Sequence, residues 1–118
     1  MKLYCERWVY RIGNSVIEVD NGFAWPGFAQ ERMVVNGETV QSHQGWFHAR
    51  QDFFEPWIVP GGEGMLTITM VSGLLRVHCR AKLDGAPVEP AETLKAEWSG
   101  PKGAWPPQDA WVAVSRRP

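Results

Sequence analysis

Residues 66–85 read LTITMVSGLLRVHCRAKLDG, and this stretch decides the fold class. Leu66, Ile68 and Met70 alternate with polar or smaller neighbours, and after a Ser-Gly turn residues 77–83 alternate between apolar and basic or histidine side chains. A period of two is typical of a strand that buries one face and leaves the other in water. The Asp-Gly pair that ends the stretch is a hairpin signal. The stretch therefore predicts an antiparallel meander in an all-β protein.

The rest of the chain continues this pattern. β-type patterns predict further strands at residues 3–12, 16–20, 27–35, 38–42, 45–54 and 110–114. The Asn-Gly pair at 36–37 is the strongest hairpin signal, the pair at 21–22 is expected to end the second strand, and the Pro- and Gly-rich segment 56–64 predicts a loop. Residues 90–97 fit either a short helix or a strand. We therefore expect an antiparallel β-sandwich or flattened barrel of about seven or eight strands.

Length, composition and charge narrow the class of protein. The chain has 118 residues, of which 44% are hydrophobic and 21% charged, and this predicts a single all-β domain over 1–118 with its own core. The net charge of −1 gives no overall field that attracts nucleic acid, and no apolar run is long enough to span a membrane. Scattered charges among the first residues argue against a secretory signal, so we expect a cytoplasmic location.

Two segments share one order of features and indicate an internal repeat. Units at about 14–42 and 65–90 each hold a strand, a glycine turn, a strand segment that opens with arginine, an Asn-Gly or Asp-Gly turn and a valine. Duplication would build a pseudo-symmetric sandwich or barrel, followed by a C-terminal extension at 91–118. Chance similarity is the alternative, because β-hairpins share this turn chemistry.

The same segments resemble a known family. The resemblance rests on IEV at 17–19, QERMVVNGETV at 30–40, GWF at 45–47, VSGL at 71–74 and LDG at 83–85. These motifs are similar to those of the Fas apoptotic inhibitory molecule family, and together they cover roughly residues 8–88.

The resemblance implies a compact antiparallel β fold that acts through protein contacts without an active site. The protein would then be a non-catalytic interaction module. Three features depart from the family pattern: the Ala-Trp-Pro segment at 24–26, the Pro-Gly-Gly loop at 60–62 and the tryptophan-bearing tail. A shared fold does not carry a shared partner with it, so the partner does not follow from the resemblance.

The residues that most often carry catalysis are few and poorly placed for it. Cys79 is in phase with the apolar side of its strand and the adjacent His78 points the other way, so they do not form a nucleophilic pair. No spacing requires Cys5 to meet His43 or His48. The histidines and cysteines lack metal-ligand spacing, and there is no phosphate-binding glycine loop. We therefore expect no catalytic residue, no metal and no cofactor.

A stripe of potential cations follows one strand, at Arg76, His78, Arg80 and Lys82. Because these residues are spaced two apart, they share one face, and such a row suits phosphate or an acidic partner. The alternative is a solvated face whose counter-charges are Glu18 and Asp20 on a neighbouring strand. The near-neutral charge of the chain favours this alternative.

Seven tryptophans are many for a chain of this length, and several aromatic residues lie in or beside loops. The candidate binding surface comprises Trp25, Trp46, Phe47, Phe54 and Trp57. Aromatic side chains exposed at loops are typical of surfaces that bind proteins or sugars. Burial under the sheet is the alternative.

Three functions from different classes follow. The first is a non-catalytic module that binds another protein. The second is a carbohydrate-binding module, which a coplanar exposed pair such as Trp25 and Trp57 would indicate. The third is a small hydrolase, which would need Cys5 or a carboxylate to face a pocket beside a histidine. Neither nucleic acid nor a membrane is an expected partner, and the oligomeric state does not follow from the sequence.

Overall fold

The fold is described from a computed structural model that covers residues 2–25, 27–46, 54–72 and 77–114, without the side chains of Trp46 and Ser72. Its strands are β1 (Lys2–Ile12), β2 (Ser15–Ala24), β3 (Phe28–Val35), β4 (Glu38–Trp46), β5 (Trp57–Val59), β6 (Gly64–Ser72), β7 (Val77–Leu83), β8 (Ala86–Val88), β9 (Glu92–Ser99) and β10 (Val112–Ala113). A 3₁₀ turn, η1 (Gln108–Ala110), precedes β10. None of the described residues forms a helix with the length and hydrophobicity needed to span a membrane.

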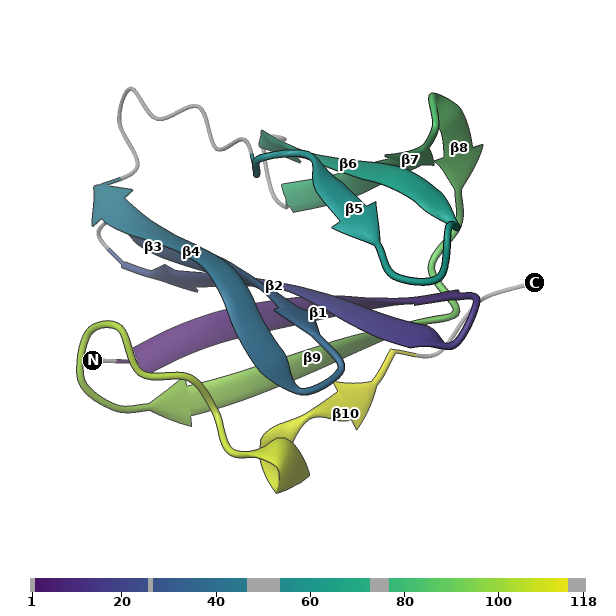
Figure 1. The fold of residues 1–118 in the computed structure, drawn as a ribbon. Coiled ribbons are helices and arrows are strands. Elements are labelled where there is room, and N and C mark those ends of the chain that lie inside the picture. The colour runs from purple at the N-terminus through teal and green to yellow at the C-terminus, as the bar shows by residue number, and fades with distance from the viewer. Residues whose placement is uncertain (1, 26, 47–53, 73–76, 115–118) are drawn as a thin grey trace.

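The strands form two antiparallel sheets that pack face to face (Figure 1). The six-stranded sheet has the order β10-β9-β1-β2-β3-β4, and the four-stranded sheet has the order β5-β6-β7-β8. Neither sheet closes on itself. The predicted all-β sandwich is therefore confirmed, and the flattened barrel is wrong. The described residues form ten strands, where about seven or eight were expected.

The main core lies between the two sheets. Trp8, Tyr10 and Ile17 of the six-stranded sheet belong to the same buried cluster as Leu66 and Ile68 of the four-stranded sheet. Burial of apolar side chains is the dominant favourable term in folding, at about 25 cal/mol per Å². It also sets the register, because a slip of one residue would turn the apolar side of a strand toward water.

Two turns of the same geometry close the β3–β4 and β7–β8 hairpins. Asn36 and Asp84 both have φ of 49°, and the glycines after them have φ of 85° and 84°. Positive φ at both central positions is typical of a type I′ turn, which favours Asn or Asp followed by Gly. The Asn36 side chain accepts a hydrogen bond from Val16 N at 2.9 Å, and the Asp84 side chain accepts one from Met65 N at 2.9 Å. The two units of the predicted repeat thus lie in different sheets and close alike, while their duplication stays a prediction.

Three local predictions are revised by the structure. β2 does not end at residues 21–22 but continues to Ala24, because it pairs with β1 and β3 through these positions. Gly22 fits between the two partner strands, since a Cβ there would lie 3.2 Å from Cys5 Sγ and 3.3 Å from Gln30 Cγ. The predicted loop at 56–64 contains β5, which pairs with β6. Residues 92–99 form β9, so the strand alternative is right for that segment.

The C-terminal segment gives the six-stranded sheet a second buried face. Figure 1 shows the segment after β9, in yellow-green and yellow, on the side of this sheet that faces away from the four-stranded sheet. A second cluster of buried residues forms there: Leu3, Cys5, Ala24, Phe28, Ala96 and Trp111. This layer brings the tryptophan-bearing tail against β1, β2 and β3, and it positions the polar groups described next.

Candidate functional site

Trp25 is the most exposed large hydrophobic side chain of the described residues, at 80%. It lies in the turn between β2 and β3, which is closed by a hydrogen bond from Gly27 N to Ala24 O at 2.9 Å. A residue in a tight turn projects beyond the sheet, and this explains its exposure. Its ring packs edge-to-face on Phe23, with centroids 6.5 Å apart.

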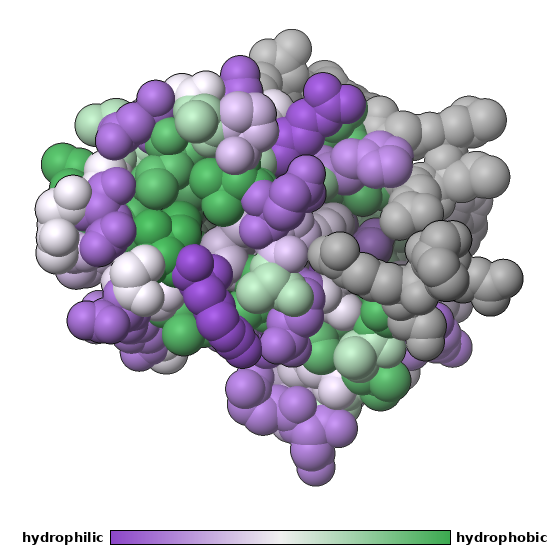
Figure 2. All heavy atoms as spheres, turned by 90° about the vertical axis from the view of Figure 1, so that its right-hand side faces the viewer, coloured by the Kyte–Doolittle hydropathy of each residue, from purple (hydrophilic) through white to green (hydrophobic). Residues whose placement is uncertain are grey.

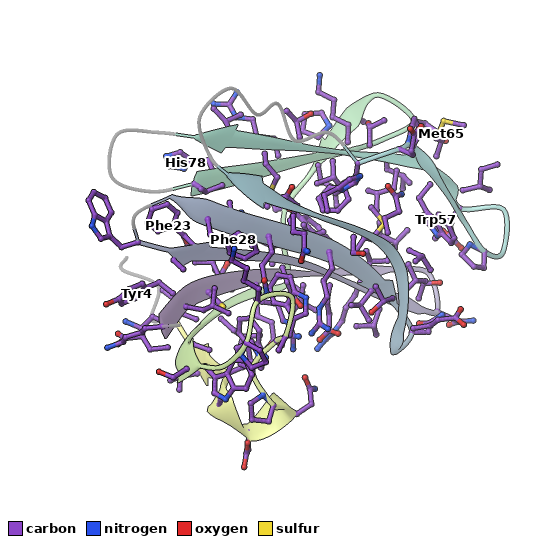
Figure 3. All side chains as sticks on the ribbon, turned by 90° about the vertical axis from the view of Figure 1, so that its left-hand side faces the viewer. Tyr4, Phe23, Phe28, Trp57, Met65 and His78 are labelled. Carbon is purple, nitrogen blue, oxygen red and sulfur yellow. The ribbon has the colours of Figure 1, made fainter. Side chains whose placement is uncertain are left out.

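Phe23 and Tyr4 extend this surface onto the sheet. The two residues are directly opposite each other in the β1–β2 ladder, and Tyr4 is also exposed. Figure 3 shows them on one side of the molecule, away from Trp57 and Met65. We call Tyr4, Phe23 and Trp25 the aromatic end. Trp25 was among the predicted site residues and Phe23 lies in the loop region, residues 23–28, that was expected to form the surface. Tyr4 was not predicted, and its exposure follows from its place near the end of a strand.

Two other predicted aromatics are not surface residues. Phe54 is 5% exposed and belongs to the main core, and Trp57 packs against that core from β5. The side-chain amide of Gln41 contacts Glu55 N and Glu55 O at 2.7 and 2.8 Å and so holds the chain where Phe54 enters the core. The burial alternative is right for Phe54, and Trp57 is partly buried. The Trp46 side chain and Phe47 lie outside the described parts of the chain.

A second group of exposed hydrophobic side chains lies at an edge of the four-stranded sheet. Ile58 is 71% exposed and is opposite Met65, also exposed, in the β5–β6 ladder. Figure 2 views the molecule from the side opposite to Figure 3 and shows hydrophobic residues gathered in one region with hydrophilic ones around them. Ile58 carries no aromatic ring, and its exposure makes it a matched control for Trp25.

The cationic stripe lies on the outer face of the four-stranded sheet. His78, Arg80 and Lys82 are exposed along β7, while Arg76 is outside the described residues. The proposed counter-charges are wrong, because Glu18 and Asp20 belong to the other sheet. Within the described part of the chain, no carboxylate forms an ion pair with Arg80 or Lys82. The stripe is therefore an exposed basic face.

A row of polar residues crosses the outer face of the six-stranded sheet, through Arg7, Asp20, Arg32 and Ser42 on β1 to β4. Arg7 and Asp20 are buried, Arg32 is partly buried and Ser42 is exposed. Asp20 is fully buried and accepts hydrogen bonds from Arg7 Nε at 2.7 Å, Arg7 Nη2 at 2.9 Å and Arg32 Nε at 2.8 Å. Glu18 lies 3.3 Å from Arg7 Nη1. Desolvation lowers the pKa of Arg7, but the hydrogen bond and charge of Asp20 outweigh it and raise the pKa overall, so Arg7 stays charged.

Two tryptophans of the C-terminal segment cover the two arginines of this row. The Trp111 ring centroid lies 4.2 Å from Arg7 Cζ, and the Trp105 centroid lies 4.7 Å from Arg32 Cζ. Gln108 Oε1 accepts a hydrogen bond from Arg7 Nη1 at 3.0 Å. Cation–π contacts of this kind stabilise a desolvated guanidinium by about 2 kcal/mol. The segment thus shields the ion pairs from water and also supplies the arginines with ring contacts and a hydrogen bond.

This row was not among the predicted site residues. The alternation of strands gave a usable signal, since Arg7, Asp20 and Arg32 fall on the same side of three consecutive strands. Alternation does not indicate whether that side is exposed to solvent or buried by another segment of the chain. The cover comes from Trp105 and Trp111, which lie far along the chain from the strands they contact.

A pocket of about 280 Å³ lies beside this row, between β3, β4 and the C-terminal segment. Side chains of the outer sheet face and the covering segment line it: Gln30, Arg32, Ser42, Gln44 and Trp105. Gln30 ties the two walls together, because its Nε2 donates to Ala104 O at 2.8 Å and its Oε1 accepts from Gly103 N at 3.1 Å. The pocket is polar and has an arginine in its wall.

Two titratable residues that border the pocket belong to the other side of the sheet. Glu31 and His43 are opposite each other in the β3–β4 ladder, one position out of phase with Arg32 and Ser42. The His43 ring packs 5.8 Å from that of Phe54 in the core, and Glu31 is buried beside Asn21. Arg32 is therefore the ionisable side chain that the described residues offer to the pocket.

The two cysteines are free, and both are protonated at neutral pH. Burial, with the charge of Asp20 as the second cause, raises the pKa of Cys5 to about 12. Burial raises the pKa of Cys79 to about 11, and its Sγ lies 3.4 Å from Tyr10 Oη. A thiolate is the nucleophilic form of cysteine, so neither residue is activated for catalysis. The described residues contain no group of three or more His, Cys, Asp or Glu placed to hold a metal ion.

Comparison of the chain with protein-family models, with curated proteins and with solved structures found no match in any of the three. The resemblance to the Fas apoptotic inhibitory molecule family therefore stays a prediction from the motifs.

Proposed function

We propose that this protein is a non-catalytic module that binds another protein through the aromatic end. The observation that carries the proposal is the exposure of Trp25, whose indole contacts Phe23 and projects from a tight turn. Exposure of a large apolar ring to water is unfavourable, and burial of the ring against a partner is therefore favourable. Tryptophan is also enriched among the residues that contribute most to the affinity of interfaces. Because the turn holds Trp25 in place, little conformational entropy is lost on binding.

The arrangement of the aromatic rings supports a protein partner over a sugar. A sugar platform needs a ring face with coplanar neighbours, and the suggested pair of Trp25 and Trp57 lacks this geometry because Trp57 packs into the core. Phe23 and Trp25 meet at an interplanar angle of 63°, so they do not form a flat platform either. The hydrolase hypothesis has no support from the thiols, since burial keeps both protonated.

Affinity purification with matched baits tests the proposal. Wild type, Trp25→Ala and Ile58→Ala serve as baits, because both substitutions remove an exposed hydrophobic side chain, at opposite edges of the sandwich. Each captured protein is then purified and its affinity measured by calorimetry. Trp25→Ala is expected to weaken the affinity for one purified partner about tenfold or more, as for a residue that dominates an interface. Ile58→Ala is expected to leave this affinity unchanged. The melting temperatures of the three proteins should agree.

Two outcomes would replace this proposal. Equal binding of a purified partner to wild type and Trp25→Ala would remove the aromatic end from the interface. Binding to a glycan array that is lost in Trp25→Ala, without any protein partner, would instead assign the surface to carbohydrate.

A further inference from the structure

We propose that the pocket beside Arg32 is a binding site for a small carboxylate anion, independent of the aromatic end. The pocket lies between the outer face of β3 and β4 and the segment that covers it, and it has a volume of about 280 Å³. That is space for roughly nine waters at liquid density, so the ligand is a small metabolite-sized acid.

The Arg32 guanidinium is held in a fixed position by Asp20 and by the ring of Trp105, which also lines the pocket. Its Nε donates to Asp20 Oδ2 at 2.8 Å, and its face packs on the Trp105 ring at 4.7 Å. Within the described residues its two Nη atoms have no hydrogen-bond partner. An arginine that is oriented in advance and has free donors is suited to receive a carboxylate, because less rotamer entropy is lost on binding.

The charges around Arg32 favour a single negative charge on the ligand. Asp20 is its only ion-pair partner among the described residues, and Asp20 also accepts two hydrogen bonds from Arg7. Arg7 also has Glu18 at 3.3 Å from its Nη1, so the two arginines and the two carboxylates of this group balance in charge. The other acidic neighbour, Glu31, lies on the opposite side of the sheet. Because the pocket offers the Nη donors of one arginine without excess positive charge, a monoanionic carboxylate matches it better than phosphate, which needs more cationic donors.

The remaining walls supply neutral hydrogen-bonding groups. Ser42 is opposite Arg32 in the β3–β4 ladder and Gln44 is opposite Gln30, so both point to the same face as Arg32. Gly103 approaches Gln44 so closely that a Cβ there would lie 3.1 Å from Gln44 Oε1. A hydroxyl on the ligand has hydroxyl and amide partners in this wall, so the site favours a hydroxy acid over the unsubstituted acid.

Titration of the full chain by NMR tests the proposal. The probes are acetate, glycolate and benzoate, each compared with its neutral amide, and the signals followed are the Arg32 Nε–H and the side-chain amides of Gln30 and Gln44. The acids, and not the amides, should give saturable shifts at these groups, with glycolate binding more tightly than acetate.

Two variants with the same change in charge separate the pocket from general electrostatics. Gln44→Glu places a carboxylate in the pocket at an exposed position and should weaken glycolate binding about tenfold or more. Thr67→Glu adds the same charge to the exposed face of the other sheet and should change the affinity less than about twofold. Equal shifts from acids and amides, equal weakening by both variants, or no saturable shift at millimolar concentrations would overturn the proposal. Tighter binding of inorganic phosphate would overturn the assigned ligand class.

Discussion

Arg7 and Asp20 are directly opposite each other in the β1–β2 ladder and form a two-point ion pair, with Nε–Oδ1 at 2.7 Å and Nη2–Oδ2 at 2.9 Å. Both residues are buried, on a sheet face that would meet water without the C-terminal segment. A buried ion pair is stable only while both partners are present, because each charge would otherwise be buried without compensation. Several consequences of this arrangement can be measured.

Asp20→Asn should strongly destabilise the protein. The substitution leaves Arg7 buried without its main carboxylate and weakens the anchor of Arg32, and breaking a buried pair in this way costs about 3–5 kcal/mol. Glu97→Gln is the control, because it breaks the exposed Lys2–Glu97 pair, whose charges are screened by water and contribute little to stability. Urea unfolding measures both. Similar losses for the two variants would contradict the assigned importance of the buried row.

Trp111→Ala should both destabilise the protein and expose Cys5. Trp111 covers Arg7 and shares a buried cluster with Cys5, so its removal is expected to cost about 3 kcal/mol. In a Cys79→Ala background, where Cys5 is the remaining thiol, the rate of reaction with a thiol reagent should rise. Trp25→Ala, the same change at an exposed position, should alter neither stability beyond about 0.5 kcal/mol nor the reaction rate. An unchanged reaction rate in Trp111→Ala would argue against the covering role.

Alkaline pH should destabilise the protein in part through Cys5. Its pKa is about 12 in the folded chain against an ordinary value of 9.0, so between these pH values the unfolded thiol loses its proton while the folded one keeps it. The contribution is fully present below pH 9.0 and falls by about 1.4 kcal/mol for each pH unit above it. The stability difference between wild type and Cys5→Ala should therefore shrink by about 2 kcal/mol from about pH 8 to about pH 10.5. Parallel pH profiles of unfolding would rule out the raised pKa.

The two hairpin turns should respond alike to exchange of their first residues. Asn36 and Asp84 combine positive φ with a side-chain oxygen that accepts a backbone hydrogen bond. Asn36→Asp and Asp84→Asn keep both properties and should change the free energy of unfolding by less than about 0.5 kcal/mol. Asn36→Ala and Asp84→Ala lose the acceptor and strain the backbone, so each should cost about 1–2 kcal/mol. Unequal losses in the two alanine variants would show that the turns are not equivalent.

The cationic stripe should bind acidic polymers in a salt-sensitive manner. Arg80→Glu with Lys82→Glu reverses two exposed charges that have no carboxylate partner in the described residues, and it should abolish binding to polyglutamate at low salt without changing the melting temperature. Lys2→Glu with Lys95→Glu makes the same change in net charge on the other sheet and should preserve binding. If both double variants bind as wild type does, the stripe is a solvated face.

Local patterns in the sequence were sufficient for the hairpins. The Asn-Gly and Asp-Gly pairs at 36–37 and 84–85 form the expected turns because their backbone preference needs no tertiary contact. The alternation in residues 66–83 correctly separated core from surface in the four-stranded sheet, since His78 is exposed and Cys79 packs against the core. The prediction of a strand end at Gly22 was wrong, and a side chain there would meet Cys5 Sγ at 3.2 Å and Gln30 Cγ at 3.3 Å, on the two neighbouring strands and outside any local window.

Some features of the candidate sites could also be predicted from local sequence, whereas others depend on tertiary contacts. The exposure of Trp25 agrees with its place in a turn, whereas Phe54 and Trp57 looked equally suited to a surface and are held by the core. Loop position alone does not distinguish these cases, because burial of an aromatic ring depends on the packing of residues that are distant in the sequence. The pocket beside Arg32 had no signal in the sequence, since its two walls are 73 or more positions apart at Gln30 and residues 103–105.

By itself the sequence determined that this is an all-β protein with alternating strands and tight glycine turns, because period-two burial and turn preference act over a few neighbouring residues. The tertiary structure alone decided that the outer face of the six-stranded sheet is also buried. Arg7 and Gln108 are 101 positions apart, and only folding brings the tail over the row of Arg7, Asp20 and Arg32. That contact converts a polar strand face into a buried ion-pair network, since the strength of charge interactions depends on the exclusion of water by groups distant in the chain.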